Sequence, residues 1–145
     1  MILFLYKTKY NVTQGGVFLR NLSASSQDYL EAVLELANES EYVRSVDIAE
    51  RLSVSRASVS RALGVLKNAG FIEQERYGSI TLTPEGQIAA REVKERHIAL
   101  RTFLIEMLGV NPTIAEQDAC RMEHSISTET LQKLKKFMEH HGGNA

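Results

Sequence analysis

The apolar residues of this chain recur at helical spacing over most of its length, and alternate with polar residues in one short stretch. The first strongly periodic segment runs from about Ser25 to Asn38, and it predicts a helix with one buried face. Ser25 and Ser26 are suitable N-cap residues for this helix. Its apolar stripe consists of Tyr29, Leu30, Val33, Leu34 and Ala37.

The next two periodic segments, at positions 45–54 and 55–67, are short and closely spaced, which is typical of a helix-turn-helix. Their shared core is predicted to contain Ile48, Ala49, Leu52, Val54, Val59, Leu63 and Leu66. After Gly70 the pattern alternates over 71–76 and 80–83, which predicts a β-hairpin. A helix-turn-helix followed by a hairpin indicates a winged helix.

The rest of the chain is predicted to be helical. Thr83 and Pro84 are favourable at the N-cap and first position of a long helix that ends near Leu108, before Gly109. Two more helices are predicted at 112–126 and 128–140. The apolar stripes of the long helix and of the helix at 112–126 have little domain mass behind them, so we expect these helices to pack against a second copy of the chain. These stripes contain Val93, His97, Leu100, Leu104 and Met107, and Ala115, Ala119, Met122 and Ile126.

The predicted fold class is therefore mainly α with a small β-hairpin wing. We expect an N-terminal extension at 1–22, a winged-helix DNA-binding domain at 23–95, and a helical metal-binding and dimerisation domain at 96–145. The extension reads equally well as a hairpin around Gly15 and Gly16 or as a loosely ordered segment.

Charge and composition fit this organisation. The net charge is -1, but the stretch from Tyr42 to Ile105 holds 10 Lys and Arg against 7 Asp and Glu. A single cysteine excludes an intramolecular disulfide and favours a reducing compartment. Without a signal peptide or a long apolar run, we expect a cytoplasmic protein with no membrane partner.

The second helix of the pair is the expected DNA-reading element, because its first residues point at base edges in the major groove. Its exposed polar candidates are Arg56, Ser58, Ser60 and Arg61. Arg44, Lys67 and Arg76 suit phosphate contacts. The alternative is a small helical domain with a solvated basic face. If the helix-turn-helix reads DNA, the expected partner is double-stranded DNA.

Cys120, Glu123 and His124 stand at i, i+3 and i+4, which would put a thiolate, a carboxylate and an imidazole on one helical face. All three are donors for first-row transition metals. Cys120 alone would be read as a small buried hydrophobe.

The segment from Asp118 to Ser127 resembles the metal-binding helix of the diphtheria toxin repressor and manganese transport regulator family. Ser26–Glu31 resembles that family's first helix, and Val46–Ala49 with Ser58–Ser60 resembles its helix-turn-helix. Leu82–Gly86 resembles its wing-to-helix junction, and Arg96–His97 resembles its connecting helix. The match spans roughly residues 23 to 140.

The resemblance implies a homodimeric repressor that binds palindromic operator DNA when loaded with Fe(II) or Mn(II), with Co(II), Ni(II) or Zn(II) as substitutes. The implied ligands are Asp28, Glu31, His97, Cys120, Glu123 and His124. Asp28 is the residue of the manganese branch, whereas Cys120 is that of the iron branch. The short chain also lacks the iron branch's third domain, which favours the manganese architecture.

Two positions depart from the iron branch, because Arg101 stands where that branch has Glu and Glu116 where it has His. Other readings of single residues remain open. His97 could be a packed core histidine, Asp28 a carboxylate serving the helix dipole, and Glu31 a solvated surface residue.

Two other classes of function remain alternatives. One is a winged-helix regulator that senses an organic ligand, in which the Cys/Glu/His cluster is only structural. The other, a metal-dependent hydrolase, is disfavoured because the chain has no His-Glu-x-x-His motif. We therefore expect no enzymatic activity and no organic substrate.

Overall fold

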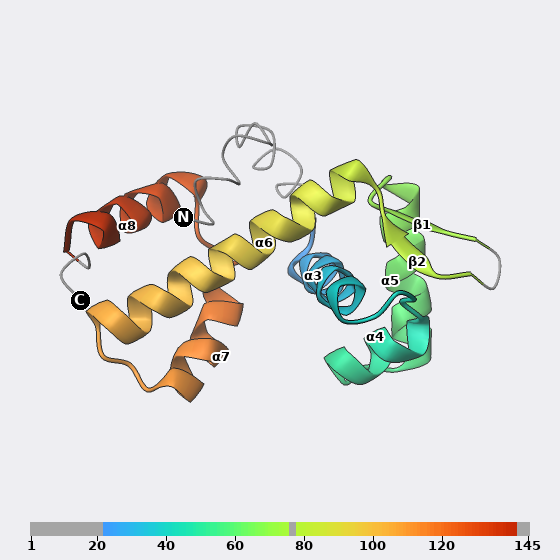
Figure 1. The fold of residues 1–145 in the computed structure, drawn as a ribbon, viewed down its shortest axis with the longest axis horizontal. Helices are drawn as coiled ribbons and strands as arrows, with labels where there is room; N and C mark the ends of the chain where they lie inside the picture. Colours follow the sequence, from blue (N-terminus) through green and yellow to red (C-terminus); the bar gives the residue numbers. More distant parts are fainter. Residues whose placement is uncertain (1–21, 76–77, 142–145) are drawn as a thin grey trace. The chain divides into compact units, whose positions relative to one another are not determined.

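The computed structural model describes residues 22–75 and 78–141, and it is mainly helical with one two-stranded hairpin (Figure 1). Its elements in chain order are α3 (Ala24–Glu39), α4 (Ser45–Leu52), α5 (Arg56–Asn68), β1 (Ile72–Gln74), β2 (Ile80–Leu82), α6 (Pro84–Thr102), the π-helical turn η1 (Phe103–Met107), α7 (Pro112–Met122) and α8 (Thr128–His141). The chain divides into two compact units, the first ending at Glu92 and the second beginning at Val93. The expected extension at 1–22 lies almost wholly outside the described residues.

The N-cap of helix α3 lies two residues before Ser25, the first of the predicted caps. The N-cap is Ser23, whose Oγ accepts a hydrogen bond from the backbone N–H of Ser26 at 3.1 Å. The prediction of Ser25 and Ser26 as caps was wrong, because both already lie within the first helical turn and Ser26 is buried there. Of the predicted apolar stripe, Tyr29, Leu30, Val33 and Leu34 are buried, but Ala37 is exposed.

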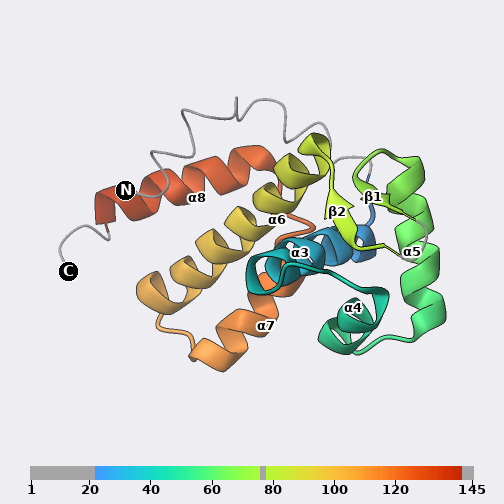
Figure 2. The same cartoon turned by 45° about the vertical axis from the view of Figure 1, so that its right-hand side comes forward.

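Helices α4 and α5 form the predicted helix-turn-helix (Figure 2). The turn between them is tight because Ser53 adopts a left-handed conformation (φ +54°), which ends α4. Ser55 then caps α5 through its Oγ, which accepts from the N–H of Ser58 at 3.1 Å. Ile48 and Val59 are fully buried, so one face of each helix joins the core of the first unit and the other stays exposed.

The wing is a short antiparallel ladder in which Ile72 lies opposite Leu82 and Gln74 opposite Ile80. Behind it, Thr83 caps α6 as predicted, because its Oγ accepts from the N–H of Gly86 at 3.0 Å. A Cβ atom at Gly86 would lie 1.9 Å from the carbonyl oxygen of Phe71, so this close approach requires glycine.

The long helix reaches its predicted end, but its last turn is widened into a π-helix. Gly109, at φ +69°, terminates it. Helix α7 stops at Met122, four residues short of its predicted end. The guanidinium of Arg96 donates to the carbonyl oxygens of Glu123 at 3.2 Å and Ile126 at 2.6 Å. These carbonyls are thereby bound outside a helix, which explains why α7 does not continue into α8.

The second unit has a small apolar core of its own, formed by Ala99, Leu100, Ala119 and Leu131. Leu100 and Ala119 belong to the stripes that were expected to face a second subunit. Because they pack within their own chain, these positions do not support that expectation. Within the described ranges, no helix is both long and apolar enough to cross a membrane.

Candidate metal centre and nucleic-acid interface

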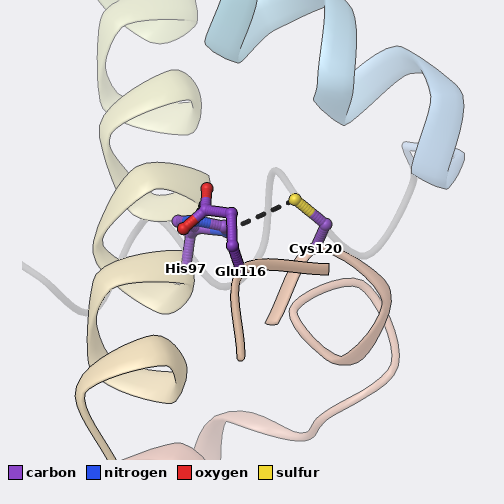
Figure 3. Close-up of side chains that lie close together, drawn as sticks. All are labelled: His97, Glu116 and Cys120. Carbon is purple, nitrogen blue, oxygen red and sulfur yellow. Dashed lines mark hydrogen bonds and ion pairs between the residues drawn. The ribbon is translucent and has the colours of Figure 1, made fainter. Parts of the chain in front are cut away.

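Three side chains that carry metal-donor atoms surround the imidazole of His97 in the second unit. His97 lies on α6, Glu116 and Cys120 lie on α7, and Glu123 is the C-cap of α7. Figure 3 shows Glu116 and Cys120 beside the His97 ring. His97 Nδ1 lies 3.7 Å from Cys120 Sγ and 2.8 Å from Glu123 Oε2, and His97 Nε2 lies 2.8 Å from Glu116 Oε1.

Glu123 is the most deeply buried of these groups, with 1% of its side chain exposed. One carboxylate oxygen meets His97. The other, Oε1, is 3.4 Å from His124 Nε2 and makes no hydrogen bond to any residue of the described chain. A buried carboxylate needs a charged or hydrogen-bonding partner to offset its desolvation. An oxygen left without a hydrogen bond in such a place suits a cation.

His97 has carboxylates on both sides, and its side chain is only 12% exposed. The hydrogen bond to Glu123 raises the pKa of His97 to about 9, burial opposes the rise, and the charges of Glu123 and Glu116 add to it. At neutral pH both ring nitrogens are therefore protonated. The positive charge of this imidazolium lies where the donor atoms converge. These polar contacts do not support the reading of His97 as a packed core histidine.

The separation of the donor atoms fits a transition metal. Thiolate and imidazole ligands bind zinc at about 2.3 Å and about 2.0–2.1 Å, which places them about 3.5 Å apart in tetrahedral geometry. The observed distance between Cys120 Sγ and His97 Nδ1 is 3.7 Å. Glu123 offers a carboxylate on the same side of the ring. This donor set can therefore hold a divalent metal once His97 Nδ1 has lost the proton that it shares with Glu123.

The structure brings together the predicted residues His97, Cys120, Glu123 and His124 within the second unit. Glu123 and His124 lie in the turn after α7, and only Cys120 lies within the helix. Glu116, which was not predicted as a site residue, also contacts His97. Its position four residues before Cys120, on the same helical face, was the signal available in the sequence.

Asp28 and Glu31 belong to the first unit, where both are half-buried on α3. Because Ser23 is the N-cap, Asp28 lies beyond the first turn, and that turn contains no acidic residue. The reading of Asp28 as a carboxylate that serves the helix dipole is therefore not supported, since that effect is confined to the first turn.

The exposed face of α5 carries the residues expected to read DNA. Arg56, Ser60 and Arg61 are exposed there, whereas Val59 and Leu63 on the opposite face are buried. Ser58 is also exposed, although its hydroxyl lies 2.9 Å from that of the capping Ser55. This arrangement presents two guanidinium groups and two hydroxyls at the start of the second helix.

Two of the three residues expected to contact phosphate, Arg44 and Lys67, are exposed in the first unit. Arg44 is the N-cap residue of α4, with an exposed side chain that pairs with Asp47 at 3.3 Å. Lys67, at the end of α5, is exposed and reaches the carbonyl of Gln74 in the wing at 3.5 Å. Arg76 lies outside the described residues.

The fold of the first unit defines a winged-helix DNA-binding protein, and the second unit adds a cluster of transition-metal donors. Comparison with known proteins agrees on both points. Residues 21–80 match the family model of the iron dependent repressor N-terminal DNA binding domain. Residues 83–143 match the model of the iron dependent repressor metal binding and dimerisation domain.

The transcriptional regulator MntR of Salmonella typhimurium is 42% identical over 118 residues, which cover 81% of this chain and 74% of that protein. The structure of the manganese regulator SloR superimposes with a TM-score of 0.72 at 28% identity, covering 79% of this chain and 53% of SloR. A manganese-dependent transcriptional repressor solved with manganese gives a TM-score of 0.72 at 29% identity, covering 79% and 52%. This chain spans about half the length of those two structures.

The chain belongs to the iron-dependent repressor and MntR family of metal-dependent transcriptional regulators. The resemblance and fold class predicted from the sequence are thus confirmed, and so is the expectation of a regulator rather than an enzyme.

Proposed function

We propose that this chain is a repressor of metal-homeostasis genes that binds palindromic operator DNA as a homodimer when Fe(II) or Mn(II) is bound. The observation that carries the proposal is the convergence of Cys120 and Glu123 on one side of His97, at 3.7 Å and 2.8 Å from Nδ1. Such a set of thiolate, carboxylate and imidazole donors, in a family of metal-dependent regulators, is best explained as part of the metal site. The protein would act in the cytoplasm, where DNA is accessible.

Asp28 and Glu31 are the proposed ligands from the DNA-reading unit, and His97, Cys120, Glu123 and His124 are those from the second unit. The first two rest on the resemblance of Ser26–Glu31 to the family's first helix. Thiolate and imidazole favour Fe(II), Co(II), Ni(II) or Zn(II), whereas the carboxylates also suit Mn(II). The bound metal supplies positive charge that offsets the mutual repulsion of the carboxylates.

The proposed switch follows from where the ligands lie along the chain. Donors from both units become restrained together when the site is filled, so the orientation of the reading helix is restricted. In a dimer, two restrained α5 helices can match successive major grooves about 34 Å apart. Typical coupling between such sites is roughly 1–3 kcal/mol, which corresponds to a 5- to 150-fold change in DNA affinity.

The homodimer is proposed from the family model and from the surface of the second unit. Several large apolar side chains of this unit remain exposed, namely Ile98, Leu108, Ile114, Met122 and Phe137. Their exposure in one copy of the chain supports burial against another. Analytical ultracentrifugation measures the resulting mass directly.

The assignment of DNA contacts is also a proposal. Arg56 and Arg61 suit guanine edges, Ser58 and Ser60 suit bases or phosphates, and Arg44, Lys67 and Arg76 suit phosphates. The organic-ligand alternative is not favoured by the family comparisons, and the donor cluster gives the metal reading a specific chemical basis.

Substitution of two proposed ligands tests the function. Wild type, Cys120→Ala and His124→Ala are titrated against operator DNA in a gel-shift assay, with chelator and then with Mn(II) or Fe(II) under anaerobic conditions. His140→Ala is the matched control, because His140 is an exposed histidine on α8. We expect both ligand variants to lose the metal-dependent increase in affinity and His140→Ala to keep it. Unchanged metal dependence in both ligand variants would refute the proposal.

A further inference from the structure

The two nitrogens of the His97 ring face different partners. Nδ1 faces Glu123 Oε2 at 2.8 Å and Cys120 Sγ at 3.7 Å, which is the side of the proposed ligands. Nε2 faces Glu116 Oε1 at 2.8 Å (Figure 3). Since the lone pairs of the two ring nitrogens point away from each other, one metal ion cannot bind both. Glu116 therefore meets the nitrogen that the proposed metal site does not use.

Glu116 is itself held by a second group. Its other carboxylate oxygen, Oε2, accepts a hydrogen bond from Arg101 Nε at 2.7 Å. Arg101 lies one turn after His97 on α6, whereas Glu116 lies on α7. The three side chains form a line in which a guanidinium orients a carboxylate and the carboxylate orients an imidazole.

The ion pair between Arg101 and Glu116 contributes little to the stability of the fold. The side chains of Arg101 and Glu116 are 44% and 52% exposed, and pairs with such exposure are weakened by solvent and salt. The geometry of the His97 contact has a more specific consequence. Histidines that bind metals commonly donate their second ring N–H to a carboxylate, which fixes the tautomer and orientation of the ring and strengthens it as a donor.

We propose that Glu116, oriented by Arg101, is a positioning residue of the metal centre that holds the proton on His97 Nε2 and so directs Nδ1 toward the metal. This inference rests on the proposed function, because it takes His97 as a ligand. It assigns a role to the two positions at which the sequence departs from the iron branch of the family. In this chain they are not ligands but support one.

The test compares Glu116→Ala, Glu116→Gln and Arg101→Met with wild type and Glu129→Gln. Glu129 is the matched control, because it is an exposed carboxylate of the same unit that pairs with Lys133 at 3.9 Å. Zn(II) affinity is measured by competition with a chromophoric chelator. Coordination is followed by the near-ultraviolet thiolate-to-metal band and the visible bands of the Co(II)-loaded proteins.

We expect Glu116→Ala to bind Zn(II) about 10- to 100-fold more weakly than wild type. Glu116→Gln keeps a carbonyl oxygen that accepts from Nε2–H, so its loss is smaller, and Arg101→Met falls between Glu116→Gln and wild type. At saturation the Co(II) spectra of all variants should match that of wild type. In Zn(II)-loaded protein, long-range ¹H–¹⁵N correlation should show the His97 proton on Nε2.

If wild type binds Zn(II), the proposed function stands. Three results would then overturn the role of Glu116 alone. The first is equal Zn(II) affinity in wild type and Glu116→Ala. The second is a changed Co(II) spectrum in Glu116→Ala at saturation, which would make Glu116 a ligand. The third is a proton on His97 Nδ1 in the Zn(II)-loaded protein. Absence of Zn(II) and Co(II) binding by wild type would overturn both proposals.

Discussion

Substitution of Glu123 by glutamine in the metal-free protein should lower the pKa of His97. The hydrogen bond from His97 Nδ1 to Glu123 Oε2 is the largest cause of the rise of that pKa to about 9. Glutamine keeps an oxygen that can accept this hydrogen bond but removes the negative charge. Because glutamine keeps the hydrogen bond and Glu116 remains on the other side of the ring, the pKa should fall toward 6.5 without reaching it.

The size of the effect follows from the same values. The difference between a pKa of about 9 and the ordinary 6.5 corresponds to about 3 kcal/mol of preference for the protonated ring in the folded state. Because the folded pKa is the higher one, this stability is fully present below pH 6.5 and is lost as the pH rises through about 9. Glu123→Gln should therefore cost up to about 3 kcal/mol more at pH 6 than at pH 10.

Two measurements check this prediction in the presence of chelator. The NMR shifts of the His97 ring give its pKa in wild type and Glu123→Gln, and urea unfolding at pH 6 and pH 10 gives the free energies. Glu129→Gln should leave both unchanged, and Glu116→Gln should lower the pKa less than Glu123→Gln does. An unshifted His97 pKa in Glu123→Gln, or a destabilisation equal at the two pH values, would refute the reasoning.

Three further predictions concern DNA contact and folding. Arg56→Ala should weaken operator binding by about 1–3 kcal/mol and relax discrimination at the base pair that Arg56 contacts. Fluorescence anisotropy on single-base variants of the operator measures both effects, and an equal loss of affinity on every sequence would instead indicate a phosphate contact. Lys67→Ala should weaken binding on all sequences and reduce the slope of log affinity against log salt by about 1, so an unchanged slope would contradict this assignment. Gly86→Ala should lower the melting temperature, because its Cβ would lie 1.9 Å from the Phe71 carbonyl oxygen. Gly64→Ala, with open space around it, should leave the melting temperature unchanged or raise it. Equal melting temperatures of the two variants would show that the backbone around Gly86 can move to admit a Cβ.

The helices of this fold could be predicted from the sequence, but several of their ends could not. Periodicity identified most buried positions, since burial of an apolar face is what stabilises a helix in a protein, although Ala37, Val54 and Met122 are exposed. The end of α7 at Met122 depends on Arg96, whose guanidinium binds carbonyl oxygens 27 and 30 residues further along the chain. A contact over such a distance leaves no local pattern. The π-helical turn after Thr102 likewise has no sequence signal that we can identify.

The candidate site was predictable to a different degree for each residue. The spacing of Cys120, Glu123 and His124 indicated a shared face directly, whereas His97 was implied only by the resemblance to a family. The spacing of Glu116 and Cys120 could have placed Glu116 near the site, but not at His97 Nε2, because that depends on which ring nitrogen each neighbouring side chain meets. That orientation is set by how α6 and α7 pack, and it appears only in the structure.

If a metal bound by these donors controls DNA binding, the DNA affinity of the wild-type chain must depend on the free metal concentration. A duplex selected from a randomised library with Mn(II)-loaded protein serves as the operator, and fluorescence anisotropy is recorded anaerobically with chelator, Mn(II), Fe(II) and Zn(II). Affinity for this duplex should rise about 5- to 150-fold when metal is bound. Equal affinity in chelator and at saturating Mn(II) and Fe(II) would contradict it.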